Sequence, residues 1–122
     1  LCLVGDGDRR DECEELVKRL NLGERVVFTG VRSDIPNVLK AADVVIMSSH
    51  LEGFGLAAVE GMAAGKPVVA SDVVGLGDIV KNYGCVFPQG DERKLAEIVD
   101  CLRNDSNLYK ALAGQCYSRS KD

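Results

Sequence analysis

The sequence has no long hydrophobic run and no excess of basic residues, and these two absences restrict what the chain can do. No apolar stretch approaches the roughly 18 residues that a membrane-spanning helix needs, and no signal peptide is visible. The formal net charge is -4, so no general attraction for nucleic acid or for an anionic membrane is expected. An anionic ligand must therefore be held by local groups.

Cysteine motifs are missing as well. The chain has five cysteines, an odd number, without CxxC or zinc-type spacing, so neither a disulfide framework nor a metal site is indicated. We interpret them as small core hydrophobes in a reducing compartment. This predicts a cytoplasmic location, with attachment of the full-length protein to the cytoplasmic face of a membrane left open. The cysteines are Cys2, Cys13, Cys85, Cys101 and Cys116.

Length and composition predict one folded domain. A chain of 122 residues can build a single hydrophobic core, and two cores would be crowded. Apolar residues make up 46% and charged residues 28%, which is typical of a globular protein and argues against disorder. The chain opens on Leu1, without a methionine, inside an apolar run. We therefore expect residues 1–122 to be one domain, truncated at its N-terminal side, from a longer protein.

Short runs rich in β-branched residues alternate with segments of helical period. The apolar residues within each run are consecutive, which is typical of strands covered on both faces. The first helix, with Asp8 or a neighbour as its cap, has its apolar stripe between residues 13 and 20. The pattern predicts an α/β fold with a Rossmann-like, three-layer parallel sheet and helices on both faces. Strands are expected at 1–5, 25–30, 43–49, 67–71 and 84–87, and later helices at 33–42, from 56 to before 65, at 91–103 and at 106–119.

A glycine-rich loop is expected at the working edge of this sheet. Ligands of parallel α/β sheets bind where the carboxyl ends of strands lead into helix N-termini. The sequence "GFGL" at 53–56 lies at such a place. Glycines there let a phosphate approach backbone amides at the positive end of the helix dipole. We expect the amides of Gly55, Leu56 and Ala57 to form a site for an anion.

Two carboxylates flank this loop, Glu52 before it and Glu60 about one turn into the helix. Glu60 has apolar neighbours all around the helix in "LAAVEGMAAG", so we expect it to be buried and to need a partner. Helical side chains lean toward the N-terminus, so Glu60 is expected to point back toward the anion site. Carboxylates on either side of a phosphate accept hydrogen bonds from hydroxyl groups. This arrangement suits a sugar nucleotide.

These residues also resemble a known family. Glu52, the glycine loop and Glu60 reproduce the E-x7-E motif of retaining glycosyltransferases of the GT-B fold, group 1 or family 4. The stretch "EGFGLAAVEGMAAGKPVVAS" carries the most specific part of the resemblance, which extends over essentially the whole chain. The chain resembles the C-terminal, donor-binding domain of that family, which implies the C-terminal half of a GT-B fold.

The resemblance also implies roles for individual residues. Glu60 would hold the ribose hydroxyls, and Glu52, the catalytic residue, would hold donor-sugar hydroxyls near the reacting carbon. The loop amides would face the diphosphate, and the loop after the second strand would lie near the base. Transfer would retain the anomeric configuration, without a metal or other cofactor. The donor-binding residues so implied are Gly53, Phe54, Gly55, Leu56, Ala57, Glu60, Val31 and Arg32.

Missing parts limit what this chain is expected to do by itself. Family members carry an upstream Arg and Lys that neutralise the leaving diphosphate, and that segment is absent, so donor binding should be weak. An acceptor saccharide or lipid-linked glycan would be held by the absent N-terminal domain, so we predict no catalysis by the chain alone. No nucleic acid partner is expected. The loop after the fourth strand has Gly77 and Asp78 where Pro and Glu are usual, which puts its donor contact in doubt.

Two other functions stay open on the sequence. The first is a non-catalytic nucleotide-binding or interaction domain of the same fold, in which Glu60 is a structural carboxylate and Glu52 an exposed loop acid. The second is an NAD-dependent oxidoreductase domain. It is disfavoured because Arg10 occupies the place of the third glycine of a dinucleotide motif, and because Thr29 and Gly30 end the second strand where an acidic residue is required. His50 lies near the loop but is left out of the catalytic set.

Overall fold

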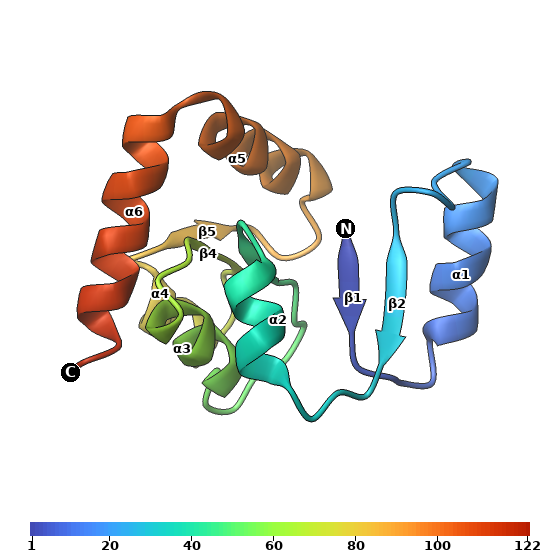
Figure 1. Cartoon of the computed structure of the whole chain (residues 1–122), viewed down its shortest axis with the longest axis horizontal. Coiled ribbons are helices and arrows are strands. Elements are labelled where there is room, and N and C mark those ends of the chain that lie inside the picture. The colour runs from blue at the N-terminus through green and yellow to red at the C-terminus, as the bar shows by residue number, and fades with distance from the viewer. The chain divides into compact units, whose positions relative to one another are not determined.

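The structure is a computed structural model that describes all residues 1–122. The chain divides into two compact units, Leu1–Ile35 and Pro36–Asp122 (Figure 1). None of the helices combines the length and the apolar character required to cross a membrane. The expectation of a single domain stays a prediction.

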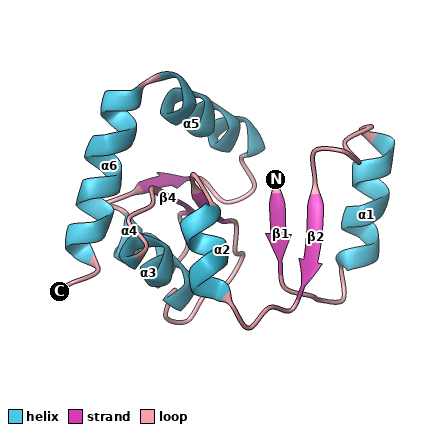
Figure 2. Cartoon of the chain, in the orientation of Figure 1, coloured by secondary structure: helices cyan, strands magenta, loops and turns pink.

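The first unit contains two strands and one helix, which are β1 (Cys2–Val4), α1 (Arg10–Arg19) and β2 (Val27–Gly30). The strands are parallel, with Cys2 opposite Val27 and Leu3 opposite Phe28. The guanidinium of Arg10, at the start of α1, lies 5.7 Å from the centre of the Phe28 ring. This contact places the beginning of the helix against β2 (Figure 2).

The start of α1 differs from the prediction. Arg9, the neighbour of Asp8, occupies the N-cap position, but no side chain forms a capping hydrogen bond there. The first turn instead carries Asp11 and Glu12, and the last turn carries Lys18 and Arg19. This charge arrangement complements the helix dipole, which favours acidic groups at the N-terminus and basic groups at the C-terminus.

The second unit contains a three-stranded parallel sheet in the order β3-β4-β5. Its first helix, α2, begins at Ile35, the last residue of the first unit. The central strand β4 is buried along its whole length, as the consecutive apolar residues Val68, Val69 and Ala70 predict, and the buried stretch includes Ser71. The elements are α2 (Ile35–Ala41), β3 (Val45–Met47), α3 (Leu56–Ala63), β4 (Val68–Ser71), α4 (Leu76–Val80), β5 (Cys85–Phe87), α5 (Glu92–Asn104) and α6 (Ser106–Arg119).

Helices cover both faces of this sheet, which confirms the predicted three-layer α/β fold. Val68 and Ala70 of β4 pack in one hydrophobic cluster with residues of α3 and α4 and with Cys116 of α6. Val69, whose side chain points to the opposite face, packs in a second cluster with residues of α5 and α6. Alternate residues of one strand thus anchor the two helical layers.

Two features of the fold depart from the prediction. The five strands form two sheets, because β1 pairs with β2 and the other strands pair among themselves. Hydrophobic patterning indicates that a strand is covered, but it does not record which strand lies beside it. The segment after β4, expected to be a loop, contains the short helix α4, which has only five residues. Such a helix is too short to display a helical period.

The cysteines are mostly not part of the core. All five are free thiols, and of these only Cys116 is buried. Cys85 is half-buried, whereas Cys2, Cys13 and Cys101 are exposed, so the expected core role is wrong for these three. The apolar stripe of α1 explains the case of Cys13, because its members Leu16 and Leu20 are themselves 43% and 57% exposed. A helical stripe indicates a face that can be covered, and here that face is open.

Candidate functional site

The candidate site begins where β3 runs into the loop 48–55 and the loop turns into α3. Gly55 adopts a left-handed conformation, with φ 58°, at the N-cap position of α3, and no side chain caps the helix. The amide groups of Gly55, Leu56 and Ala57 donate no hydrogen bond within the chain. These donors lie at the positive end of the helix dipole, and binding of an anion to them stays a prediction.

Close packing and backbone conformation both favour glycine at Gly55. A Cβ atom there would lie 3.2 Å from Ile79 Cδ1 and 3.3 Å from Leu76 Cδ1, both in α4. The left-handed backbone adds strain for any other residue. The missed helix α4 therefore supports the turn that exposes the amides of α3.

The segment just before α4 supports the loop in a second way. A Cβ atom at Gly75 would lie only 2.8 Å from the carbonyl oxygens of both Glu52 and Gly53, so these oxygens face Gly75. No peptide bond is cis, and in a trans peptide unit the N–H points opposite to the C=O. The amides of Gly53 and Phe54 consequently point away from Gly75. Like the amides at the start of α3, they donate no hydrogen bond within the chain.

Glu52 is half-buried in this loop. The Ser49 hydroxyl donates a hydrogen bond to Glu52 Oε2 at 3.3 Å. The Ser71 hydroxyl, at the end of β4, donates in turn to the carbonyl oxygen of Ser49 at 2.6 Å. Sequence reasoning did not identify either serine. The only signal was the position of Ser49, three residues before Glu52.

His50 is held by Gln89, from the loop after β5. The Gln89 Nε2 atom lies 2.7 Å from His50 Nδ1 and 3.3 Å from the His50 carbonyl oxygen. A carbonyl oxygen can only accept a hydrogen bond, so the amide nitrogen of Gln89 is the atom that faces His50. This nitrogen can only donate, so His50 Nδ1 accepts the bond from Gln89. The neutral ring then carries its proton on Nε2. His50, which the sequence reading left aside, thus presents an N–H donor two residues before Glu52.

Glu60 is exposed, which corrects the expectation of a buried carboxylate. Helix α3 buries one face through Ala58, Gly61 and Met62, and a Cβ atom at Gly61 would lie 3.1 Å from Val45 of β3. Glu60 lies on the opposite face with Leu56, which is 69% exposed. Apolar residues occupy that face too, so the sequence pattern did not indicate that the face is exposed to solvent. The carboxylate is free to meet a ligand that approaches the N-terminus of α3.

The rim of the loop is apolar and open. Phe54 is 81% exposed, and Leu51 and Val74 are 90% and 87% exposed. Leu51 and Phe54 belong to the loop itself, and Val74 adjoins Gly75, which contacts the loop backbone. The donors of the loop are thus bordered by side chains that water solvates poorly.

Val31 and Arg32 belong to the first unit, so their predicted place near the donor base stays a prediction. Val31 is 83% exposed. Arg32 forms a bidentate ion pair with Asp34, in which both N–O distances are 2.7 Å. This hydrogen-bonded pair holds the pKa of the Asp34 carboxyl below its usual range. The positive charge of Arg32 is therefore already partnered within the chain.

The loop after β4 explains why Gly77 stands where the resemblance leads one to expect proline. The Gly77 amide donates to the carbonyl of Val73 at 2.8 Å, a bond that proline is unable to make. A Cβ atom at Gly77 would also lie 2.5 Å from Asp72 Oδ1. Asp78, in place of the usual glutamate, is exposed in the first turn of α4.

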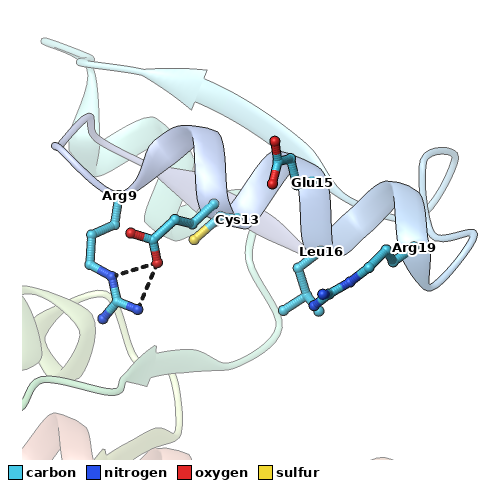
Figure 3. Close-up of a pocket in the computed structure, with 6 residues that line it drawn as sticks. Arg9, Cys13, Glu15, Leu16 and Arg19 are labelled. Atoms are coloured by element: carbon cyan, nitrogen blue, oxygen red, sulfur yellow. Dashed lines mark hydrogen bonds and ion pairs between the residues drawn. The ribbon is translucent and has the colours of Figure 1, made fainter.

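A surface hollow lies elsewhere, on helix α1 of the first unit (Figure 3). Arg9 and Glu12 form an ion pair at one end of it. All six lining residues come from α1 or the residue before it, so the hollow is a groove between side chains of one helix. It contains none of the predicted site residues. No group of three or more His, Cys, Asp or Glu side chains in the chain could hold a metal ion.

The parallel α/β architecture, with unpaired amides at the N-terminus of α3, defines a domain of Rossmann-like fold. Residues 1–119 match the family "Glycosyl transferases group 1". The chain therefore belongs to this glycosyltransferase family, which confirms the resemblance to group 1, whereas the retaining mechanism and the assignment to family 4 stay predictions. Structural neighbours of the GT-B class agree with the predicted C-terminal half of that fold.

Curated relatives agree with this assignment. The chain is 46% identical over 110 residues to an uncharacterized glycosyltransferase, MJ1607, of Methanocaldococcus jannaschii, covering 86% of this chain and 28% of that protein. It is also 46% identical over 110 residues to the 2-deoxystreptamine glucosyltransferase of Streptomyces kanamyceticus, covering 84% of this chain and 28% of that protein. The chain thus spans less than a third of the length of these relatives.

Solved structures show the same fold. Anabaena Alr3699/HepE in complex with UDP-glucose matches with a TM-score of 0.92 and 33% identity, covering 98% of this chain and 35% of that one. The C-terminal domain of the group 1 family protein LpcC from Francisella tularensis matches with a TM-score of 0.83 and 30% identity. That match covers 93% of this chain and 61% of the other.

Proposed function

We propose that this chain is the donor-binding part of a retaining glycosyltransferase that transfers a sugar from a nucleoside diphosphate to an acceptor. The observation that carries the proposal is the turn at Gly55. In a chain of the group 1 family, this turn leaves the first amides of α3 unpaired between Glu52 and Glu60. Unpaired amides at a helix N-terminus suit a diphosphate, and flanking carboxylates suit hydroxyl groups.

Each part of the site has a role in this proposal. The amides of Gly53, Phe54 and Gly55, with those of Leu56 and Ala57, stabilise the charge that develops on the departing diphosphate. Glu60 accepts hydrogen bonds from the ribose hydroxyls. Glu52 orients the donor sugar near the reacting carbon. Such fixed donors act mainly by positioning and by electrostatic stabilisation.

Uridine diphosphate is the first donor nucleotide to test. Alr3699/HepE, at 33% identity, was crystallised with UDP-glucose. An Escherichia coli relative, 38% identical over 81 residues, is named as using UDP-Gal with a diphosphoundecaprenol acceptor. We propose an acceptor saccharide or lipid-linked glycan bound outside this chain, with Val31 and Arg32 near the base. We further propose a cytoplasmic protein that needs no metal, and no transfer by the chain alone.

The test is calorimetric titration of the full-length protein with UDP, without added metal. Glu60→Gln should weaken binding by about 1 to 3 kcal/mol, because it removes charge-assisted hydrogen bonds to the ribose. Glu92→Gln, an exposed glutamate at the start of α5, is the matched control and should leave binding unchanged. Equal affinity in the Glu60 variant and in the control would refute the ribose assignment.

A second measurement separates an enzyme from a nucleotide-binding module. The product of transfer from UDP-glucose is followed by its anomeric proton signal, which reports whether the configuration is retained. Glu52→Gln should reduce transfer much more than UDP binding, because Glu52 faces the sugar in the proposal. Tight UDP binding without any transfer, in the full-length protein with a panel of acceptors, would favour the binding module instead.

A further inference from the structure

Ser71 is the one buried polar side chain of the chain, with 1% of its surface exposed. It ends β4, the central strand, and its hydroxyl donates to the carbonyl oxygen of Ser49 at 2.6 Å. The Met47 carbonyl lies farther from the same hydroxyl, at 3.4 Å. A buried hydroxyl that found no partner would destabilise the fold. Its bond to Ser49 therefore ties the start of the loop 48–55 to the buried central strand of the sheet.

Ser49 continues this connection toward the site. Its hydroxyl lies 3.3 Å from Glu52 Oε2. A carboxylate can only accept, so the serine donates this bond. Two successive hydrogen bonds thus link the buried strand β4 to the carboxylate of the loop.

We propose that Ser49 is a positioning residue that holds the Glu52 carboxylate in one orientation, and that Ser71 holds Ser49. The inference rests on the proposed function, in which Glu52 faces the donor sugar. A free glutamate side chain samples several rotamers, and each misplaced rotamer lowers the fraction of molecules ready to react. The hydroxyl of Ser49 selects one of them before the donor arrives.

The loop has other anchors, so the role of Ser49 can be separated from loop folding. Gln89 donates to His50 Nδ1 at 2.7 Å, next to Ser49 in the chain. The carbonyl oxygens of Glu52 and Gly53 pack against Gly75. Removing the Ser49 hydroxyl should thus leave the loop backbone in place and free only the Glu52 side chain.

The experiment compares Ser49→Ala, Ser49→Thr and the control Ser48→Ala in the full-length protein. Ser48 is the adjacent serine and is exposed. Side-chain NMR couplings of selectively labelled glutamate, assigned with Glu52→Gln, report the rotamers of Glu52 without any donor. We expect one dominant rotamer in the wild type, the Ser48 variant and Ser49→Thr, and rotamer averaging in Ser49→Ala.

Kinetics complete the test. Ser49→Ala should lower kcat for sugar transfer about fivefold, the effect of one ordinary hydrogen bond, with the UDP dissociation constant unchanged. Ser49→Thr should restore kcat, because it keeps the hydroxyl. A merely structural serine would instead raise the UDP dissociation constant and lower thermal stability together.

The outcomes separate this inference from the proposed function. Unchanged Glu52 rotamers in Ser49→Ala overturn the positioning role, whatever the enzyme does. Changed rotamers with unchanged kcat also overturn it. If the wild type neither binds UDP nor transfers sugar, the proposed function fails. The donor-free NMR comparison then still decides whether Ser49 holds Glu52.

Discussion

The two units of the chain differ in how deeply they bury their residues. No residue of Leu1–Ile35 is fully buried. The second unit contains every buried core residue, distributed over both faces of β4. The proposed catalytic residue Glu52 and the amides of α3 belong to this second unit. A site that must hold groups in fixed positions thus lies in the part with a close-packed core.

The largest expected effect tests the close packing around Gly75 in the second unit. Gly75→Ala should lower the free energy of unfolding by about 3 kcal/mol, from left-handed backbone strain and overpacking against the Glu52 and Gly53 carbonyls. Gly90→Ala is the control, since Gly90 also has a positive φ but a Cβ atom added there would meet no atom within 4 Å. It should cost about 1 kcal/mol. Urea denaturation followed by circular dichroism measures both, and equal costs would contradict the packing argument.

Thiol reactivity compares the units in one experiment. Cys13 is exposed on α1, whereas Cys116 is buried and burial raises the pKa of its thiol. We expect Cys116 to react with a thiol reagent at least about a hundredfold more slowly than Cys13, because access requires opening of the core. Mass spectrometry of the labelled peptides gives both rates. Similar rates would mean that the core of the second unit opens readily.

Two valines, one in a strand of each unit, test the same difference in burial. Val69 in β4 is fully buried, whereas Val27 in β2 is 59% exposed. Val69→Ala should lower the free energy of unfolding by about 2 kcal/mol, through lost burial and a residual cavity, and Val27→Ala by about 0.5 kcal/mol. Hydrogen exchange resolved by residue assigns each loss to its unit. A larger loss at Val27 would show that β2 is covered more than its exposure indicates.

The smallest expected effect concerns the ion pair between Arg32 and Asp34 in the first unit. The bond to Arg32 lowers the pKa of Asp34 in the folded state. Its contribution to stability is therefore present above the ordinary pKa of an aspartate and is lost as the pH falls through the lowered value. Because both groups are solvated, Asp34→Asn should lower the melting temperature only slightly at pH 7 and not at all in strong acid. A loss that persists in strong acid would have another cause.

Particular residues show how far the sequence could be read. Helix α3 was expected from Leu56, and the left-handed exit at Gly65, with φ 72°, follows from the Gly-Lys-Pro sequence. These are local signals. The exposure of Glu60 was misread, because Leu56 on the same face is apolar and yet exposed. The hydrogen bond from Ser71 to Ser49 joins residues 22 positions apart, and no local pattern records it.

The sequence by itself determined the strands, the helices other than α4, the family and the presence of a glycine turn before α3, because each depends on neighbouring residues and on a local backbone preference. Only the tertiary structure decided which strands pair, that Gly75 lies against the Glu52 and Gly53 carbonyls, and that Ser71 fixes the loop. Those features depend on contacts between distant segments, which hydrophobic period and turn chemistry do not specify.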